Sequence, residues 1–488
     1  MGKTMQKEKI MRKNEEISLT IHDLHANGQG VGKGETGITV FVPEALPGDM
    51  LRVKILKVKK HYAYGKIIEV IKPSAERLPK RDSRICKVAG QCGGCQFQRF
   101  DYPAQLTFKE KLVKDALTRI GNCEAPPMAS ILGMDKPYHY RNKAQFPVGR
   151  EKGKGREGDG DKERNLVKRG GKGKEKSKEK GRPLIGFYAS RSHRIVPISE
   201  CNIQHPACNE VLNAVQNILE RYPISIYDEE THQELLRHVV VRVGFNTGEV
   251  MVIFVINGNM LPHAKDIKAA FPSYTLVINE NTARTNVILG PVFTTLQGSG
   301  YIHEEIGHVR YRISPGAFFQ VNPVQTKVLY DAVAAHLSGG EKVIDAYSGI
   351  GGIALHIAGK AKNVIGIESV EAAVNDGIHN AALNGIENVR FLCGAAEELV
   401  PDLLNQGEGP DVLILDPPRK GCDERLLEAV SAARIPKIIY VSCDPATLAR
   451  DVRQLVEAGY RLMNVQPVDL FPMTGHVEAI VLLQRHDS

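Results

Sequence analysis

The sequence predicts an α/β protein whose C-terminal part, residues 311–488, forms a doubly wound parallel sheet. Apolar, β-branched runs alternate there with helical stretches, which is the pattern that parallel sheets produce. The chain has 488 residues, enough for roughly three domains of about 150 residues each. We therefore expect two further domains, at residues 15–74 and 75–310, after a basic tail at residues 1–14.

Composition narrows the class of protein. No apolar run is long enough to span a bilayer, and no hydrophobic segment follows the charged N-terminus, so a cytoplasmic protein is expected. Nine unevenly spaced cysteines favour metal binding or catalysis over a disulfide framework. The net charge is +8, but residues 151–182, with 13 Lys/Arg and 7 Asp/Glu, contribute +6 of it. The overall charge is therefore weak evidence for a nucleic-acid partner.

Residues 15–74 predict a small OB-like β-barrel, because four β-branched runs are separated by Gly and Pro turns. Basic residues crowd one strand and its exit: Arg52, Lys54, Lys57, Lys59 and Lys60. OB-like barrels bind oligonucleotides on such faces, although an edge strand protected by lysines predicts the same spacing. The glycine-rich run 28–34 lacks the Gly-Lys-Ser/Thr end of a phosphate loop and is expected to form a turn.

Residues 75–310 predict a mixed α+β domain that begins with a cysteine cluster. Within it, residues 151–182 hold eight glycines and almost no apolar residues, so a disordered surface loop with at most weak RNA attraction is expected. An amphipathic helix over residues 208–222 follows. A β-hairpin that turns at residues 246–248 comes next.

The C-terminal domain contains five expected parallel strands and two further strand-like segments. The five are residues 342–349, 363–369, 389–394, 411–418 and 437–443, and the two segments lie around residues 461–470 and 476–484. Helical stretches separate the five strands, as a doubly wound fold requires.

A glycine-rich turn joins the first of these strands to a helix and predicts a cofactor site. Gly349, Gly351 and Gly352 let the backbone approach a ligand at the helix N-terminus. Glu368 closes the next strand, 23 residues after Asp345, and an acidic residue there can bind ribose hydroxyls. The turn lacks the G-x-G-x-x-G spacing of dinucleotide sites. It therefore favours S-adenosylmethionine, which has no pyrophosphate.

Two other strand ends carry candidate chemistry. Asp416 ends the fourth strand in LDPPRKG, which predicts either a loop for a target base or a simple turn. Cys443 ends the fifth strand, at the edge of the sheet where such folds bind ligands. Free cysteines are often only packing residues, so this segment by itself leaves catalysis and packing open.

Taken together, these motifs resemble the RNA uracil-C5 methyltransferase family, above all its 23S rRNA (uracil-5-)-methyltransferases with a TRAM domain. The resemblance is carried by the cysteine cluster and six motifs: YRNKAQFPVG (140–149), SPGAFFQVNP (314–323), DAYSGIGGIAL (345–355), LDPPRKG (415–421), YVSCDPATLARD (440–451) and GHVEAIVLL (475–483). It covers nearly the whole chain apart from residues 151–182 and the extreme N-terminus. It implies a Rossmann-like S-adenosylmethionine methyltransferase domain, preceded by an OB-like TRAM barrel and a central α+β iron–sulfur domain.

The resemblance also implies roles for single residues. Cys443 matches the family's nucleophile and Glu478 its general base. The matched cofactor-binding positions are Gln320, Tyr347, Glu368 and Asp416, to which the glycine-rich turn adds Gly349. Gly352 departs from the family, since some relatives carry an asparagine there. Glu478 lies in an otherwise apolar strand, where a carboxylate is costly unless it is used or held in a structural ion pair.

The implied chemistry suits these residue types. Uracil carbon-5 is too weak a nucleophile to accept a methyl group directly. A thiolate that adds to carbon-6 produces an enolate, whose carbon-5 attacks the sulfonium methyl group. A carboxylate then removes the carbon-5 proton, and the thiol leaves. Cys422 is the rival nucleophile by position, while Cys393 matches no nucleophile motif. The target uridine must flip out of its stack to reach the thiol.

The cysteine cluster has the spacing Cys86-x5-Cys92-x2-Cys95, and the resemblance implies Cys201 as a fourth ligand. Four thiolates suit zinc or an iron–sulfur cluster, and the resemblance implies [4Fe–4S]. The spacing is not that of radical enzymes, so a structural or RNA-positioning role is expected. Cys208 is the main alternative ligand, and Cys123 is unassigned.

These observations predict an S-adenosylmethionine-dependent enzyme that makes 5-methyluridine in 23S rRNA. It is expected to act as a monomer and to bind neither DNA nor membranes. Three alternatives stay open. A tRNA uridine methyltransferase is disfavoured, because the bacterial tRNA enzymes of this family lack the barrel and the cluster. The others are a non-catalytic RNA-binding or ribosome-assembly factor and a radical iron–sulfur enzyme.

Overall fold

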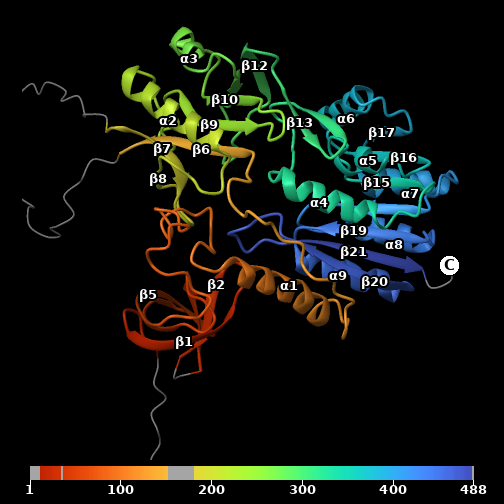
Figure 1. Cartoon of the computed structure of the whole chain (residues 1–488), viewed down its shortest axis with the longest axis horizontal. Coiled ribbons are helices and arrows are strands. Elements are labelled where there is room, and N and C mark those ends of the chain that lie inside the picture. The colour runs from red at the N-terminus through yellow and green to blue at the C-terminus, as the bar shows by residue number, and fades with distance from the viewer. Residues whose placement is uncertain (1–10, 35–36, 152–180, 486–488) are drawn as a thin grey trace, which may run out of the picture.

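The computed structural model describes residues 11–34, 37–151 and 181–485 (Figure 1). In these residues a closed five-stranded barrel is followed by two seven-stranded sheets and a separate two-stranded hairpin. In Figure 1 the barrel lies at lower left, the central sheet above it and the C-terminal sheet at right. Helix α1 (Tyr102–Arg119) runs from the barrel along the C-terminal sheet.

The N-terminal barrel has the strand order β1-β2-β3-β5-β4. Its strands are β1 (Glu16–Leu24), β2 (Gln29–Lys33), β3 (Thr39–Pro43), β4 (Met50–Val58) and β5 (Tyr62–Lys72). Alternate apolar residues fill its interior, among them Leu51, Val53 and Ile55, which are fully buried. This alternation is what a closed barrel with one solvated face requires.

The expectation of a turn over residues 28–34 is wrong, because most of this run forms strand β2. Its glycines fit a crowded barrel wall. A Cβ atom on Gly30 would lie 2.7 Å from the Cβ of Ala45, and one on Gly32 would lie 2.7 Å from the Cγ of Leu19. Close approach of neighbouring backbone, and not a turn, explains the glycines here.

The central sheet has the order β12-β11-β10-β9-β6-β7-β8. Its strands are β6 (Lys143–Arg150), β7 (Pro183–Tyr188), β8 (Ile195–Pro197), β9 (Leu236–Val243), β10 (Val250–Ile256), β11 (Thr275–Glu280) and β12 (Val292–Gln297). Helices α2 (Pro206–Arg221) and α3 (Ala264–Ala270) accompany it. The expected amphipathic helix is confirmed as α2, and the expected hairpin as β9 and β10, which pair through Val243 and Val250.

Most of the segment expected to be a disordered loop, residues 152–180, lies outside the described residues. Its two ends are adjacent, since the Glu151 N–H donates to the Arg182 carbonyl over 2.9 Å. Strands β6 and β7 pair directly beside this contact. The segment therefore replaces the turn of a β-hairpin, where insertions disturb a sheet least.

The C-terminal sheet has the order β17-β16-β15-β18-β19-β21-β20. Its strands are β15 (Lys342–Ala346), β16 (Asn363–Glu368), β17 (Val389–Cys393), β18 (Val412–Leu415), β19 (Lys437–Ser442), β20 (Tyr460–Val468) and β21 (Glu478–Arg485). Strands β15 to β19 are parallel, whereas β21 is antiparallel to both of its neighbours. The order reverses between β15 and β18, and ligands bind at such a switch point.

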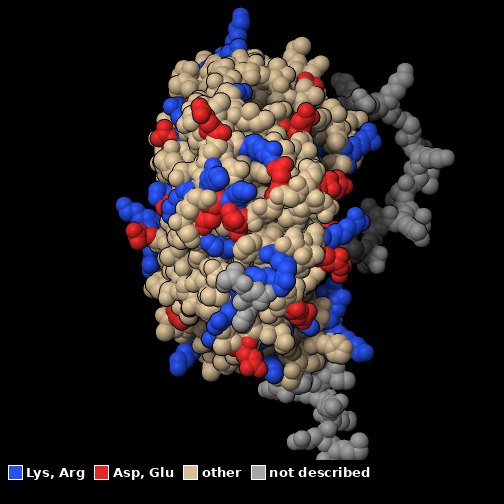
Figure 2. Space-filling model, turned by 90° about the vertical axis from the view of Figure 1, so that its right-hand side faces the viewer, with Lys and Arg blue, Asp and Glu red and all other residues tan. Residues whose placement is uncertain are grey.

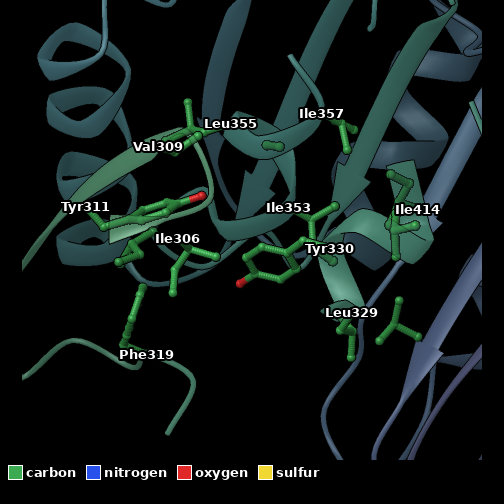
Figure 3. Packing of buried hydrophobic residues seen from close by; sticks show 14 of the residues in the cluster. Ile306, Val309, Tyr311, Phe319, Leu329, Tyr330, Ile353, Leu355, Ile357 and Ile414 are labelled. Atoms are coloured by element: carbon green, nitrogen blue, oxygen red, sulfur yellow. The ribbon is translucent and has the colours of Figure 1, made fainter. Parts of the chain in front are cut away.

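Two apolar clusters cover the two faces of this sheet, since they take alternate residues of its strands. One includes Val343 and Ile414 and contains residues of α4 (Pro323–Ala334) and α5 (Gly352–Ile357), together with the hairpin β13 (Ile302–Ile306) and β14 (Val309–Ile313). Figure 3 shows part of it, with Tyr311 and Tyr330 among aliphatic side chains. The other includes Ile344 and Leu413.

The second cluster also holds residues of α1, α7 (Ala396–Asn405), α8 (Glu424–Ala432) and α9 (Pro445–Glu457). Helix α6 (Glu371–Leu383) completes the first layer through Ala381. Because Val113 and Leu117 of α1 belong to the second cluster, α1 packs with the C-terminal sheet although it precedes the central one. In the described part of the chain, no helix has the length and apolar character needed to cross a bilayer.

Candidate active site

Cys443 and Glu478 come together at the end of two adjacent antiparallel strands. Strands β19 and β21 pair in one continuous register, whose last pair is Ser442 with Ala479. Cys443 directly follows Ser442, and Glu478 directly precedes Ala479, so both lie at this end of the two strands. Glu478 also contributes to the raised pKa of the Cys443 thiol. A thiol and a carboxylate that are far apart in sequence therefore share one strand edge.

The turn after Cys443 is fixed by the first residues of α9. The Asp444 carboxylate accepts hydrogen bonds from the backbone N–H groups of Ala446 (2.9 Å) and Thr447 (3.1 Å), and so caps the helix. The Ser442 hydroxyl accepts from the Asp444 N–H over 3.1 Å. Pro445 occupies the first helical turn, where its missing N–H has no cost. The expected strand-to-helix transition is thus confirmed, and it leaves Cys443 half-buried at the strand end.

Burial disfavours the charged form of both groups. It raises the pKa of the Cys443 thiol to about 11, with a further contribution from Glu478, while Arg419 opposes the rise. Glu478 is 5% exposed. Burial and, next, Asp416 raise its pKa to about 8, again against Arg419. A cation bound beside Asp416 would lower both pKa values, because an adjacent positive charge favours thiolate and carboxylate.

Three more carboxylates surround the glycine-rich turn. Burial raises the pKa of Asp416 to about 7. The pKa of Asp345 lies well above its usual range, mainly because of burial and next because of the neighbouring Asp416. Asp345 is 1% exposed, and neither of its carboxylate oxygens has a hydrogen-bond partner among the described residues. Glu368 accepts from the Gly349 N–H over 3.1 Å. A buried carboxyl group without a partner, such as that of Asp345, fits a cationic ligand.

The turn itself is held in unusual backbone conformations. Tyr347, Gly349 and Gly351 have φ values of 69°, 56° and 85°, and for Tyr347, a bulky residue, that value is strained. Such strain is typical of sites where a ligand must come close. Tyr347 contacts Cys422 on the second apolar cluster, and burial raises the pKa of its hydroxyl.

Gln320 is connected to the central domain through its backbone. Its carbonyl accepts from the Asn142 side chain over 3.1 Å, directly before β6. Its half-buried side-chain amide has no hydrogen-bond partner in the part of the chain that the structure describes. Gln320 is therefore free to bind a ligand, although no contact joins it to the carboxylates of the turn.

Gly352, where the chain departs from some relatives, is explained by Tyr330. A Cβ atom at position 352 would lie 2.3 Å from the Tyr330 hydroxyl, so this hydroxyl occupies the space of a side chain. Burial, then Asp416 and Asp345, raise the pKa of Tyr330. Figure 3 shows Tyr330 beside Ile353 at the start of α5. Sequence reasoning missed Tyr330, because α4 carries no motif.

The other cysteines of this domain are poor rivals to Cys443. Cys422 is 7% exposed and packs in the second apolar cluster, where burial raises its pKa to about 12. Its N–H donates to Asp451, which also accepts from Tyr440. Cys393 is exposed at the end of β17, the outermost strand of the sheet. Cys422 also neighbours a buried carboxylate, but Asp451 is already held by the Cys422 N–H, the Tyr440 hydroxyl and Arg450.

Residues 469–477, here called the base loop, connect β20 to Glu478 and are held by α1. The Lys109 ammonium donates to Asp469 over 2.6 Å, and both side chains are fully buried. The same ammonium donates to the Phe471 carbonyl over 2.9 Å. Gln105 accepts from the Met473 N–H over 3.0 Å. These contacts position the loop that carries the expected base.

Residues 86–97, which contain the first three cysteines and are here called the cysteine segment, contact the same loop. The backbone N–H groups of Gln96 and Phe97 both donate to the Met473 carbonyl, over 3.1 and 3.0 Å. Any ligand that orders the cysteine segment therefore acts on the base loop too. Sequence reasoning did not find this contact, which joins residues almost 380 positions apart.

The four cysteines expected to bind a cluster lie within electrostatic reach of one another. Burial raises the pKa of Cys95 to about 12, with smaller contributions from Cys201, Cys92 and Cys86. However, the described residues contain no group of three or more Cys, His, Asp or Glu arranged to hold a metal ion. The four cysteines are thus near one another, but in the described residues they do not have the geometry of a metal site.

The alternative ligand Cys208 is fully buried in the apolar core of the central domain, where α2 packs on the sheet. Burial raises its pKa to about 12. Cys208 is therefore a packing residue in this structure. Cys123, which was unassigned, is half-buried just after α1, where its N–H donates to the Leu117 carbonyl.

Basic side chains gather where the central sheet meets the catalytic end. Burial, then Arg242 and Arg141, lower the pKa of Lys143 to about 7. Arg242 is 3% exposed and donates to the Ala317 carbonyl. By contrast, the face seen in Figure 2 mixes acidic and basic residues without a field of one sign.

Comparison with known proteins gives two family matches. The profile of the tRNA (uracil-5-)-methyltransferase family matches residues 299–486, and that of the TRAM domain matches residues 12–68. The first match contains Cys443, Glu478 and the glycine-rich turn. The second covers nearly the whole barrel.

Relatives match over almost the full length. An uncharacterized RNA methyltransferase of Halalkalibacterium halodurans is 44% identical over 97% of this chain and 98% of its own. Another uncharacterized RNA methyltransferase, of Caldanaerobacter subterraneus, is 42% identical over 99% of this chain and 100% of its own. The crystal structure of Pyrococcus abyssi tRNA (uracil-54, C5)-methyltransferase in complex with S-adenosyl-L-homocysteine is similar with a TM-score of 0.74 and 28% identity, over 96% of this chain and 99% of that chain. With its TRAM barrel and its catalytic domain, the chain belongs to the family of RNA (uracil-5-)-methyltransferases.

Proposed function

We propose that this protein transfers a methyl group from S-adenosylmethionine to carbon-5 of a uracil in 23S rRNA, through a covalent bond to Cys443. The observation that carries the proposal is the β19–β21 pairing, whose last pair, Ser442 with Ala479, sets the adjoining Cys443 and Glu478 at the same end of the two strands. Covalent catalysis at a pyrimidine needs a thiol and a base on the same reacting ring. These two residues can supply both from one strand edge.

The residues around the turn fit S-adenosylmethionine. Its ammonium and sulfonium groups are cationic, and Asp345, Glu368 and Asp416 offer carboxyl groups whose charged forms a bound cation would favour. Both oxygens of the buried Asp345 lack a hydrogen-bond partner among the described residues. Gly349 leaves open space, since a Cβ there would meet nothing within 4 Å. Gln320 has a free side-chain amide for the same ligand, and Tyr347 shapes the turn. When bound, S-adenosylmethionine supplies the electrophilic methyl group. The P. abyssi relative, which carries the demethylated product of this cofactor, supports the assignment.

In the proposed mechanism the Cys443 sulfur, once deprotonated, forms a bond to carbon-6 of the flipped uracil. The electron pair of the carbon-5–carbon-6 double bond moves toward the carbonyl at carbon-4, and carbon-5 then accepts the methyl group. Glu478 takes the carbon-5 proton, the double bond re-forms, and the carbon–sulfur bond breaks. Arg419, which opposes the pKa rise at both groups, favours their charged forms.

A tRNA substrate is the second candidate, and the P. abyssi structure favours it. That protein is a tRNA (uracil-54, C5)-methyltransferase, yet it matches 96% of this chain, barrel included. The presence of a barrel thus does not by itself exclude tRNA. The rRNA assignment rests on the motifs that resemble the 23S rRNA enzymes.

One experiment separates these substrates. Purified protein is incubated with labelled S-adenosylmethionine and either unmodified 23S rRNA or unmodified tRNA transcripts, and 5-methyluridine is measured by mass spectrometry of nucleosides. We expect 5-methyluridine in the rRNA alone. Product in tRNA alone would overturn the rRNA assignment. No product in either RNA would favour the non-catalytic RNA-binding alternative.

We also propose that Cys86, Cys92, Cys95 and Cys201 bind a [4Fe–4S] cluster. Four thiols from two segments are a donor set suited to this group, and three of them, Cys86, Cys92 and Cys201, contribute to the raised pKa of Cys95. Metal binding relieves such repulsion among thiolates. The test is iron and acid-labile sulfide in protein purified without oxygen. About four of each per chain, lost in the Cys92→Ser variant, would support the cluster. Zinc in place of iron would overturn it.

A further inference from the structure

The outer wall of the barrel carries a group of aromatic rings. Strands β3 and β5 run parallel, with Phe41 opposite Tyr64 and Thr39 opposite Tyr62. Val40, Val42 and Ala63, which alternate with these residues, are fully buried inside the barrel. The rings of Phe41, Tyr62 and Tyr64 therefore face outward, and each is half-buried. We call these three residues the aromatic platform.

The rings of the platform contact one another. The ring centroids of Phe41 and Tyr64 are 5.9 Å apart, those of Phe41 and Tyr62 5.8 Å, and those of Tyr62 and Tyr64 5.5 Å. His25 extends the group, 5.5 Å from Phe41. Aromatic residues gain most from burial in a core, so a ring cluster on the outside of a small barrel calls for a binding partner.

Lysines continue the platform onto β4. Lys57 lies opposite Tyr64, and Lys54 lies opposite Lys66. Like charges directly opposite each other destabilise a sheet. No carboxylate lies within ion-pair distance of these three lysines in the described part of the chain. Lys57 and Lys66 are therefore available to an anion. Lys54 lies opposite Glu16 of β1, and Arg52, which sequence reasoning placed in the same basic group, is paired with Glu69.

The platform also reaches the central domain. The Arg191 guanidinium lies 6.0 Å from the centre of the Tyr64 ring. The neighbouring Ala189 pairs with Cys92, and the Gly93 N–H donates to the Tyr188 carbonyl over 2.9 Å. A ligand on the platform thus borders the cysteine segment, which in turn contacts the base loop.

We propose that the aromatic platform stacks unpaired bases of a single-stranded RNA segment, while Lys57 and Lys66 bind the adjoining phosphates. Rings side by side with cations are the combination that binds single strands, since every base has a stacking face and every nucleotide a charge. In a duplex the bases stack on one another, so their faces cannot reach the rings. The proposal rests on the proposed function only in taking the ligand to be part of an RNA substrate.

A fluorescent reporter tests the stacking directly. The chain contains no tryptophan, so Phe41→Trp places a single indole on the platform of the otherwise unchanged protein. We expect single-stranded RNA of about 12 nucleotides, within the site size of OB folds, to quench its emission. The matched control is Val456→Trp, which replaces a residue 43% exposed on α9, outside the barrel. Equal quenching of both variants, or of neither, would overturn the proposal.

Affinity gives the second measurement. The Phe41→Ala/Tyr64→Ala double variant should bind the same single strand at least about tenfold more weakly, since stacking contributes roughly 1–3 kcal/mol per base. Its affinity for a blunt duplex should change less than about twofold. Tyr64→Phe keeps the ring and should keep the affinity. Lys57→Ala should reduce the slope of log K against log salt by about 0.7.

These outcomes are independent of methyl transfer. Equal losses for single strand and duplex would refute base stacking, as would unchanged single-strand affinity in the folded double variant. A melting temperature within a few degrees of the parent protein checks that the variant is folded. If no RNA is methylated but Phe41→Trp is still quenched, the proposed function fails and the platform stands. Quenching by a protein partner and not by RNA would overturn the platform's assignment.

Discussion

Replacing Glu478 with glutamine should stabilise the folded protein at alkaline pH and change its stability little at pH 5. Burial, with a smaller contribution from Asp416, raises the pKa of Glu478 from 4.5 to about 8. A group whose pKa is higher in the folded than in the unfolded state binds its proton more tightly when folded. Its contribution to stability is therefore complete below about pH 4.5 and is lost as the pH rises through about 8.

The size of the effect follows from the same two values. Each pH unit between them costs the folded state about 1.4 kcal/mol, because the unfolded chain has already released the proton. The free energy of unfolding should thus fall by roughly 3 kcal/mol between pH 4.5 and 7, and by roughly 5 kcal/mol up to pH 8. Since Glu478 is 5% exposed, solvent screens little of this cost. Glutamine does not titrate and should abolish this part of the pH dependence.

The assay is urea-induced unfolding of the parent protein and of Glu478→Gln at pH 5, 7 and 8.5. The matched control is Glu428→Gln, an exposed glutamate of α8. The reasoning requires the stability difference between variant and parent to grow with pH for position 478 and to stay flat for position 428. A Glu478→Gln variant that is less stable than the parent at pH 8.5 would refute it, because Glu478 would then be the ionised partner of a structural ion pair.

Three further predictions concern buried groups around the site. Lys109→Met should lower the free energy of unfolding by about 3–5 kcal/mol, because Asp469 stays buried without its cation; adding Asp469→Asn should recover part of the loss in the same urea titration. Asp345→Asn should weaken S-adenosyl-L-homocysteine binding at least about tenfold by calorimetry, since it removes a buried carboxyl group whose two oxygens have no partner among the described residues; unchanged affinity would place the cofactor elsewhere. Cys422→Ser should keep most methyl transfer while Cys443→Ser abolishes it, and the opposite result would exchange their roles.

Much of the C-terminal fold could be predicted from the sequence, because buried parallel strands are continuous apolar runs and their ends carry punctuating residues. The run that ends at Cys443 shows this, since Asp444 and Pro445 mark the start of α9. The glycine-rich run of the barrel shows the limit. Its glycines mark close approach of neighbouring strands, which depends on Ala45 and Leu19 and leaves no local pattern.

The pairing of thiol and base could not be derived from local pattern, because it depends on which strands become neighbours. Glu478 begins the last strand, and only the insertion of β21 between β19 and β20 brings it to the strand end where Cys443 lies. Resemblance to the family supplied that assignment. Neither source gave Tyr330, whose hydroxyl fills the space beside Gly352, or Lys109, which holds the base loop from α1.

The central claim is that Cys443 forms a covalent bond to the target uracil and that Glu478 resolves it. The most direct test is to incubate Glu478→Gln with S-adenosylmethionine and RNA, digest the denatured product with nuclease and protease, and analyse it by mass spectrometry. The account predicts a methylated uridine nucleotide attached to the peptide that contains Cys443, and no such adduct in Cys443→Ala/Glu478→Gln. Full turnover without an adduct, or an adduct on another cysteine, would contradict it.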